Sequence, residues 1–138
     1  FHKVPVAWRR RLQTGEDFVK EDGTVIPNAW LTRDPTPSVS YAHLCDTAYK
    51  PSLAPLVHGV DLMLHDATYG DDRAPQAAER GHSTARQAAM LAREAGAKQL
   101  LLTHFSSAYK TEEPLLTQAR ELFPASILAN EGMRLRLD

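Results

Sequence analysis

The chain has 138 residues, a length that fits one domain with a real hydrophobic core but not two domains. Its 16 Lys and Arg residues against 17 Asp and Glu residues give a formal net charge of −1, so no basic surface indicates a nucleic-acid partner, although neutrality does not exclude one. Cys45 is the only cysteine, which excludes an internal disulfide and a zinc site built from several thiolates.

A single cysteine, which forms no internal disulfide, indicates a reducing, cytoplasmic setting. No apolar run approaches the roughly 20 residues of a membrane span, and no signal sequence opens the chain. The opening FHKVP, without a methionine, is typical of the interior of a longer protein. We therefore expect a fragment of a cytoplasmic protein.

Residues 1–37 are divided by glycines and prolines and form an irregular lead-in with a hairpin. VAWRRRLQTGEDF predicts a short helix that ends near Gly15, and FVKEDGTVI predicts a hairpin around Asp22 and Gly23. The arginines at positions 9–11 are either a solvated helix face, which is the more common case, or a phosphate contact.

From Ser38 to the end of the chain, predicted strands and helices alternate. The predicted strands are SVSYAHLCD (38–46), VDLMLHDA (60–67), KQLLLTH (98–104), SILAN (126–130) and MRLRLD (133–138). The predicted helices are SLAPLVHG (52–59), APQAAER (74–80), STARQAAMLAREAG (83–96) and TEEPLLTQARELF (111–123). This alternation predicts an α/β fold in which helices pack against a sheet.

The segment 83–96 is the clearest helix. Ser83 or Thr84 is its expected N-cap and Gly96 its C-terminal stop, and its alanines fall mostly on one face, so the helix can lie close to a sheet. Thr111 is expected to cap the helix that follows.

Three apolar strands end in side chains suited to metal binding or proton transfer. Asp46, Asp66 and His104 stand at these ends, and in an α/β sheet such positions line the functional edge. Carboxylate oxygens and imidazole nitrogens are ligands of Zn²⁺ and similar ions. The pattern indicates a metal-dependent hydrolase.

Each of these residues also has an ordinary interpretation. Asp46 could cap a following helix, His104 could be a hydrogen-bonded structural residue, and His82 could be a surface histidine at a helix start. His65, beside Asp66, fits a packing role or a supporting role behind the site.

The motifs CDTAY, HDATY, GHST and LTHFSSAY, in this order, resemble the carboxyl-terminal half of the ribonuclease Z family, the endonucleases that process the 3′ end of transfer RNA. The similarity runs from about residue 15 to the carboxyl terminus and includes FPASILANEGM. This family belongs to the metallo-β-lactamase superfamily, so the resemblance implies that residues 1–138 are a partial αββα sandwich.

The resemblance also implies a role for four side chains. Asp46 would bridge two zinc ions and His104 would bind one of them, while His82 would donate a proton to the leaving oxygen with Asp66 as its orienting partner. The implied reaction is hydrolysis of one phosphodiester at the 3′ side of precursor transfer RNA, by a protein that is commonly a homodimer.

The chain departs from the family pattern at three positions and lacks one motif. Asp66 stands where Glu is common, Cys45 where Gly is common, and Ala108 where many members carry a phosphate-binding Arg. The His-x-His-x-Asp-His cluster, which supplies most zinc ligands in the family, does not occur in these 138 residues. We therefore expect this chain by itself to be inactive and to bind zinc weakly.

Two other functions stay open at this stage. One is another hydrolase of the superfamily that acts on small phosphodiesters or sulfate esters with the same metal pair. The other is a half-domain without catalytic activity that associates with a partner or with itself through an apolar sheet face.

Overall fold

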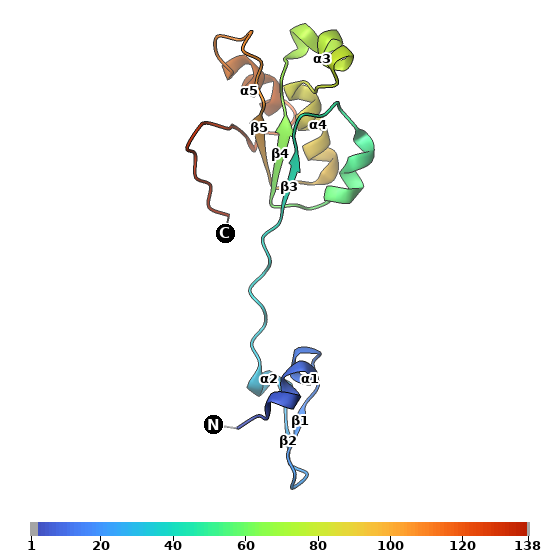
Figure 1. The fold of residues 1–138 in the computed structure, drawn as a ribbon, viewed down its shortest axis with the longest axis vertical. Helices are drawn as coiled ribbons and strands as arrows, with labels where there is room; N and C mark the ends of the chain where they lie inside the picture. The colour runs from blue at the N-terminus through green and yellow to red at the C-terminus, as the bar shows by residue number, and fades with distance from the viewer. Residues whose placement is uncertain (1–2, 138) are drawn as a thin grey trace. The chain divides into compact units, whose positions relative to one another are not determined.

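The computed structural model describes residues 3–137, in two compact units, Phe1–Ser38 and Val39–Asp138 (Figure 1). The interpretation of the whole chain as one partial domain stays a prediction. Among the described residues, no helix has both the length and the apolar character needed to cross a membrane.

The first unit contains short elements around a small core. They are η1 (Val6–Trp8), α1 (Arg9–Gln13), β1 (Phe18–Val19), β2 (Val25–Ile26) and α2 (Asn28–Leu31). The antiparallel pair β1 and β2 confirms the predicted hairpin, and Gly23 in its turn has φ +82, which glycine adopts without strain. α2 was not predicted. Asn28, the first residue of α2, joins α2 to the end of α1 and the turn that follows it, because its Nδ2 donates to the carbonyls of Leu12 and Glu16 at 2.8 and 2.9 Å.

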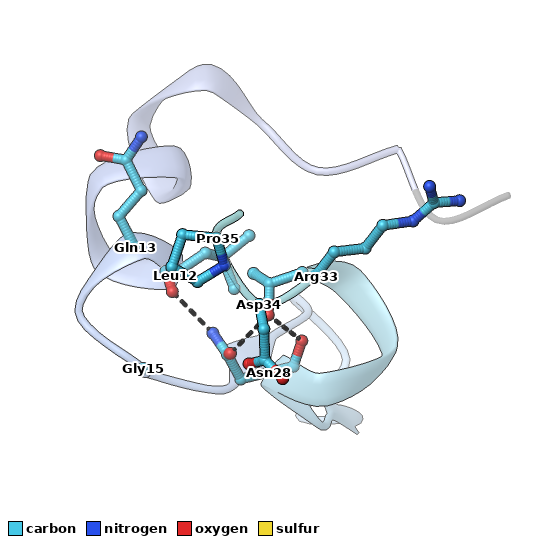
Figure 2. Close-up of a pocket in the computed structure, with 8 residues that line it drawn as sticks. Leu12, Gln13, Gly15, Asn28, Arg33, Asp34 and Pro35 are labelled. Atoms are coloured by element: carbon cyan, nitrogen blue, oxygen red, sulfur yellow. Dashed lines mark hydrogen bonds between the residues drawn. The ribbon is translucent and has the colours of Figure 1, made fainter. Parts of the chain in front are cut away.

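A pocket opens within this first unit (Figure 2). It lies between α1 and the chain that follows α2, and none of the predicted site residues lines it. The lining residues are Leu12, Gln13, Gly15, Asn28, Thr32, Arg33, Asp34 and Pro35.

The second unit is built on a four-stranded parallel sheet in the order β3-β4-β5-β6. Its strands are β3 (Tyr41–Leu44), β4 (Leu62–Asp66), β5 (Gln99–Thr103) and β6 (Ser126–Leu128). Its helices are η2 (Pro51–Val57), η3 (Asp71–Arg73), α3 (Ala74–Arg80), α4 (Ala85–Ala95) and α5 (Glu113–Arg120). A sheet whose parallel strands are joined by helical crossovers confirms the predicted α/β class.

The core lies between the sheet and the helices α4 and α5, which run beside it in Figure 1. Met63, Leu100 and Leu102 are fully buried in one cluster with the alanines of α4, and the small alanine side chains let the helix approach the strands closely. α4 begins at a capping box in which Thr84 and Gln87 exchange side-chain and backbone hydrogen bonds. It ends at Gly96 with φ +62, as predicted.

Two expectations near the carboxyl terminus are wrong. The N-cap of α5 is Glu112 rather than Thr111, although the Thr111 hydroxyl still accepts a hydrogen bond from the Glu113 amide at 3.4 Å. Residues 133–137 do not form the predicted final strand, and position 138 lies outside the described residues. An alternating sequence forms a strand only beside a partner that takes its backbone hydrogen bonds, and no strand among residues 3–137 pairs with this segment.

Candidate metal and proton-transfer site

The strand ends bring four side chains together at one edge of the sheet. Asp66 is the last residue of β4, His104 follows β5 directly, and Asp46 follows β3 by two residues. Because parallel strands share the edge at which they end, these positions are neighbours. One possible ligand atom from each of Asp46, Asp66, His82 and His104 lies within 4.8 Å of the others. The structure thus brings together every residue predicted for the site.

His82 reaches this edge from the turn between α3 and α4. The turn is held against the chain that follows β4, because the Tyr69 amide donates to Ser83 O at 3.4 Å and the Ala85 amide donates to Tyr69 O at 2.9 Å. Tyr69 also meets the His82 ring edge-on, with ring centroids 6.1 Å apart. This pairing places His82 above the end of β4.

Asp66 is the centre of the hydrogen-bond network. It is fully buried, and its Oδ2 accepts from His82 Nδ1 at 2.9 Å and from the Thr47 amide at 3.0 Å. Its Oδ1 accepts from the Thr68 amide at 2.8 Å and from Thr68 Oγ1 at 2.7 Å. Burial raises the pKa of the Asp66 carboxyl, but the hydrogen bonds from His82, Thr68 and Thr47 outweigh burial, so the pKa lies below its usual value. The group is therefore an anion at neutral pH.

This anion defines the orientation of His82. A carboxylate only accepts hydrogen bonds, so His82 Nδ1 carries the proton shared with Asp66. Asp46 Oδ1 lies 3.5 Å from the same nitrogen. The ring keeps Nε2 for other partners, and 19% of its side chain is exposed, which leaves it accessible at the edge of the site.

Asp46 and His104 have the character of metal ligands. His104 Nε2 lies 4.0 Å from Asp46 Oδ1, and both side chains reach solvent. Two ligands of one tetrahedral zinc ion stand about 3.3 Å apart, so a small side-chain movement would let this oxygen and nitrogen share a cation. A carboxylate oxygen and an imidazole nitrogen are suitable zinc ligands, but these two residues do not fill the four positions of one tetrahedral site.

The backbone marks the same two residues. Asp46 and His104 have φ values of +53 and +61, and they are the only non-glycine residues between positions 3 and 137 with positive φ. A left-handed conformation costs an L residue roughly 1–2 kcal/mol and is concentrated at functional sites. This strain is independent of the side-chain distances, and it falls on the two predicted metal ligands.

Several supporting residues were not found by sequence reasoning. Thr68 is the most important, because its hydroxyl contacts both Asp66 and His104; a signal for it was the hydroxyl residue of the HDAT motif, two positions after a buried aspartate. Tyr109 holds the loop after His104, because its hydroxyl accepts from the Gly70 amide at 2.9 Å. Nothing in the sequence marks that contact, which joins residues 39 positions apart.

Three further residues singled out in the motifs are His65, Cys45 and Ala108. His65 is fully buried, its Nδ1 donates to Asp66 O at 2.8 Å, and burial lowers its pKa. Its Nε2 has no hydrogen-bond partner among the described residues. Cys45 Sγ lies 3.7 Å from Thr103 Oγ1, and Ala108 is exposed. His65 is therefore a packed residue behind the site.

The parallel sheet, with metal-type donors at its strand ends, places the chain in a known class. Residues 22–105 match the family model described as a beta-lactamase superfamily domain. The chain therefore belongs to the beta-lactamase superfamily.

Curated relatives narrow this class and confirm the resemblance seen in the motifs. The chain is 46% identical over 135 residues to a ribonuclease Z of Parabacteroides distasonis, a match that covers 98% of this chain and 44% of the relative. A ribonuclease Z of Porphyromonas gingivalis is 43% identical over 137 residues, which cover 99% of this chain and 45% of the relative. The chain thus spans less than half the length of these relatives.

Solved structures agree with the fold. The metallo-beta-lactamase fold protein YhfI from Bacillus subtilis matches with a TM-score of 0.65 and 27% identity, over 70% of this chain and 39% of that protein. The short form of human tRNase Z matches with a TM-score of 0.50 and 33% identity, over 62% of this chain and 27% of that protein. The predicted metallo-β-lactamase type of fold is confirmed.

Proposed function

We propose that this chain forms part of a metal-dependent endoribonuclease that hydrolyses one phosphodiester at the 3′ end of precursor transfer RNA. The observation that carries the proposal is the arrangement of the edge: an imidazole oriented by a buried carboxylate stands beside a second imidazole and a second carboxylate, all within 4.8 Å. The 46% identity to a ribonuclease Z supports transfer RNA as the substrate.

Asp46 and His104 would hold zinc in this enzyme. When bound, the cations polarise the phosphate and make a water molecule more acidic. Two ligands from this chain do not complete two tetrahedral sites, so we propose that further ligands come from segments outside it. The purified chain of 138 residues should then be inactive and lose zinc on dialysis, and stoichiometric retention of zinc would contradict this.

His82 would serve as the general acid. Nδ1 is held by Asp66, so Nε2 is the atom that delivers a proton to the departing 3′ oxygen of the transfer RNA. The Asp66 carboxylate, 2.9 Å from Nδ1, holds the ring in one orientation, and the Asp46 carboxylate lies 3.5 Å from the same nitrogen. The products would be a transfer RNA with a 3′ hydroxyl and a trailer with a 5′ phosphate.

The test is a pair of substrates given to the complete protein. A precursor transfer RNA with a 3′ extension should be cut once at its 3′ end, whereas a small chromogenic phosphodiester should react slowly. Cleavage of the small ester without cleavage of the precursor would reject the proposal and favour a small-ester hydrolase of the same superfamily. Loss of both reactions in chelator and recovery with Zn²⁺ would support the metal.

We also propose that the complete enzyme is a cytoplasmic homodimer. The unpaired thiol of Cys45 supports a reducing compartment such as the cytoplasm. Exposed apolar side chains of the second unit, such as Tyr41 and Leu56, which are 70% and 79% exposed, support association into a dimer. Light scattering over a dilution series should give the mass of a dimer. A monomer at every concentration would exclude it.

A further inference from the structure

Thr68 lies between two residues of the site. Its Oγ1 is 2.7 Å from Asp66 Oδ1 and 2.8 Å from His104 Nδ1, and only 5% of the residue is exposed. The Thr68 amide donates to the same Asp66 oxygen at 2.8 Å. Two hydrogen bonds to one carboxylate oxygen therefore fix the position of this hydroxyl.

The direction of these hydrogen bonds follows from the number of protons. A threonine hydroxyl has one proton, and an ionised carboxylate accepts hydrogen bonds but donates none. The Thr68 proton is therefore donated to Asp66, because the opposite orientation would set two oxygen lone pairs against each other at 2.7 Å. The free lone pair of Oγ1 then faces His104, so His104 Nδ1 is the donor in the 2.8 Å contact.

This assignment selects one tautomer of His104. With the proton on Nδ1, the lone pair of a neutral ring is on Nε2, and Nε2 is the nitrogen that lies 4.0 Å from Asp46 Oδ1. Thr68 makes the only hydrogen bond to the His104 ring within residues 3–137. The His104 side chain is 40% exposed, so packing alone does not fix the orientation of its ring.

We propose that Thr68 is a positioning residue that holds His104 in the tautomer and orientation in which Nε2 can bind a cation. Asp66 acts on both histidines in this arrangement. It accepts from His82 directly, and it acts on His104 through the Thr68 hydrogen bond and also across the 3.8 Å between its Oδ2 and His104 Nδ1. The proposal rests on the proposed function in one respect, the assignment of a cation to Nε2. The hydrogen-bond relay itself does not depend on the substrate.

The variants Thr68→Val and Thr68→Ser test this role in the complete protein. Valine has the shape of threonine without the hydroxyl, whereas serine keeps the hydroxyl and loses a methyl group. Thr68→Ala is a second deletion of the hydroxyl in case valine prevents folding, and amide NMR spectra check the fold of each variant.

The first readout is the ¹⁵N NMR spectrum of the histidine side chains in protein stripped of metal. Wild type and Thr68→Ser should show His104 protonated on Nδ1, and Thr68→Val or Thr68→Ala should show a mixture of tautomers. If His104 keeps the Nδ1 proton without the hydroxyl, the proposal is overturned. This readout is unaffected if the protein cleaves no transfer RNA, so it separates the two proposals.

The second readout is the affinity for Zn²⁺ in a competition with a chromophoric chelator. Loss of an outer hydrogen bond to a metal-binding histidine typically costs 10- to 100-fold in affinity, and we expect this range for Thr68→Val. Thr68→Ser should bind Zn²⁺ nearly as tightly as wild type. If Thr68→Val binds Zn²⁺ as tightly as wild type, or if Thr68→Val and Thr68→Ser lose the same Zn²⁺ affinity, a role of the hydroxyl is contradicted.

Discussion

Asp66 Oδ2 accepts a hydrogen bond from His82 Nδ1 at 2.9 Å, although the whole of α3 separates the two residues in the sequence. The carboxylate is fully buried and the imidazole reaches the surface of the site. This pair orients the ring through one nitrogen and leaves the other for a reacting group. It is the arrangement expected of a general acid or base.

Replacement of His82 by alanine should lower turnover of precursor transfer RNA by about 10²- to 10⁴-fold, the usual contribution of a positioned acid. The zinc content, measured by mass spectrometry, should stay near that of wild type, because His82 is not assigned as a ligand. His43→Ala, at an exposed position of β3, is the matched control and should keep full activity. A parallel loss of zinc and activity in His82→Ala would instead make His82 a ligand.

Replacement of Asp66 by asparagine should reduce both turnover and stability. The donors around Asp66 now share two carboxylate oxygens, and the asparagine amide offers only one oxygen. At least one buried donor therefore loses its acceptor, at a cost of roughly 1–3 kcal/mol. Urea denaturation of the variant and wild type measures this loss. Unchanged stability together with full activity would show that the network around Asp66 is not needed.

Asp61 should make the second unit sensitive to acid. The hydrogen bond from Lys98, followed by those from Ser40, lowers the pKa of this carboxyl to about 2 from 3.8. Because the folded pKa is below the unfolded one, the stabilisation is present above about pH 4 and is lost as the pH falls toward 2. The difference in unfolding free energy between wild type and Asp61→Asn should shrink over this window.

The control for that series is Glu79→Gln, an exposed position on α3. Its difference from wild type should be small at every pH. A difference between wild type and Asp61→Asn that does not change from pH 6 to pH 2 would be evidence against the ion pair with Lys98.

Asp46→Gly should weaken binding of Zn²⁺ without weakening the fold. Glycine adopts the left-handed conformation of this position without the Cβ penalty, so the unfolding free energy should be unchanged or higher by up to about 1 kcal/mol. Gly96→Ala is the opposite case, since φ is +62 there, and should lose about 1 kcal/mol. Strong destabilisation by Asp46→Gly would mean that the Asp46 side chain holds the loop.

The sequence was sufficient where one local signal decided the structure. Thr84 and Gly96 mark the two ends of α4, and both could be predicted because capping and left-handed termination depend on nearby residues only. Asp46, Asp66 and His104 were expected at one edge because parallel strands end on the same side of a sheet. Their roles as ligand or orienting group came from the family resemblance and stay predictions.

Features that depend on distant partners were missed or wrong. The HDAT motif marks the Thr68 hydroxyl, but nothing local indicates that its partner is His104, 36 positions away. The segment MRLRLD has the alternation of a strand, yet alternation defines a face and not a neighbour, and residues 133–137 form no strand in the described part of the chain. Asn28 joins α2 to two carbonyls that lie 12 and 16 positions earlier, which no turn signal indicates.

The dependence of both imidazoles on Asp66 has a consequence for how this site can evolve. A substitution of Asp66 would alter both His82, the proposed proton donor, and His104, the proposed cation ligand. Neither proton transfer nor cation binding can therefore be changed at this position without a change in the other. Lineages that lengthen or shorten this side chain should therefore carry compensating changes at Thr68 or in the turn before α4, and pairwise covariation at these positions would record that history.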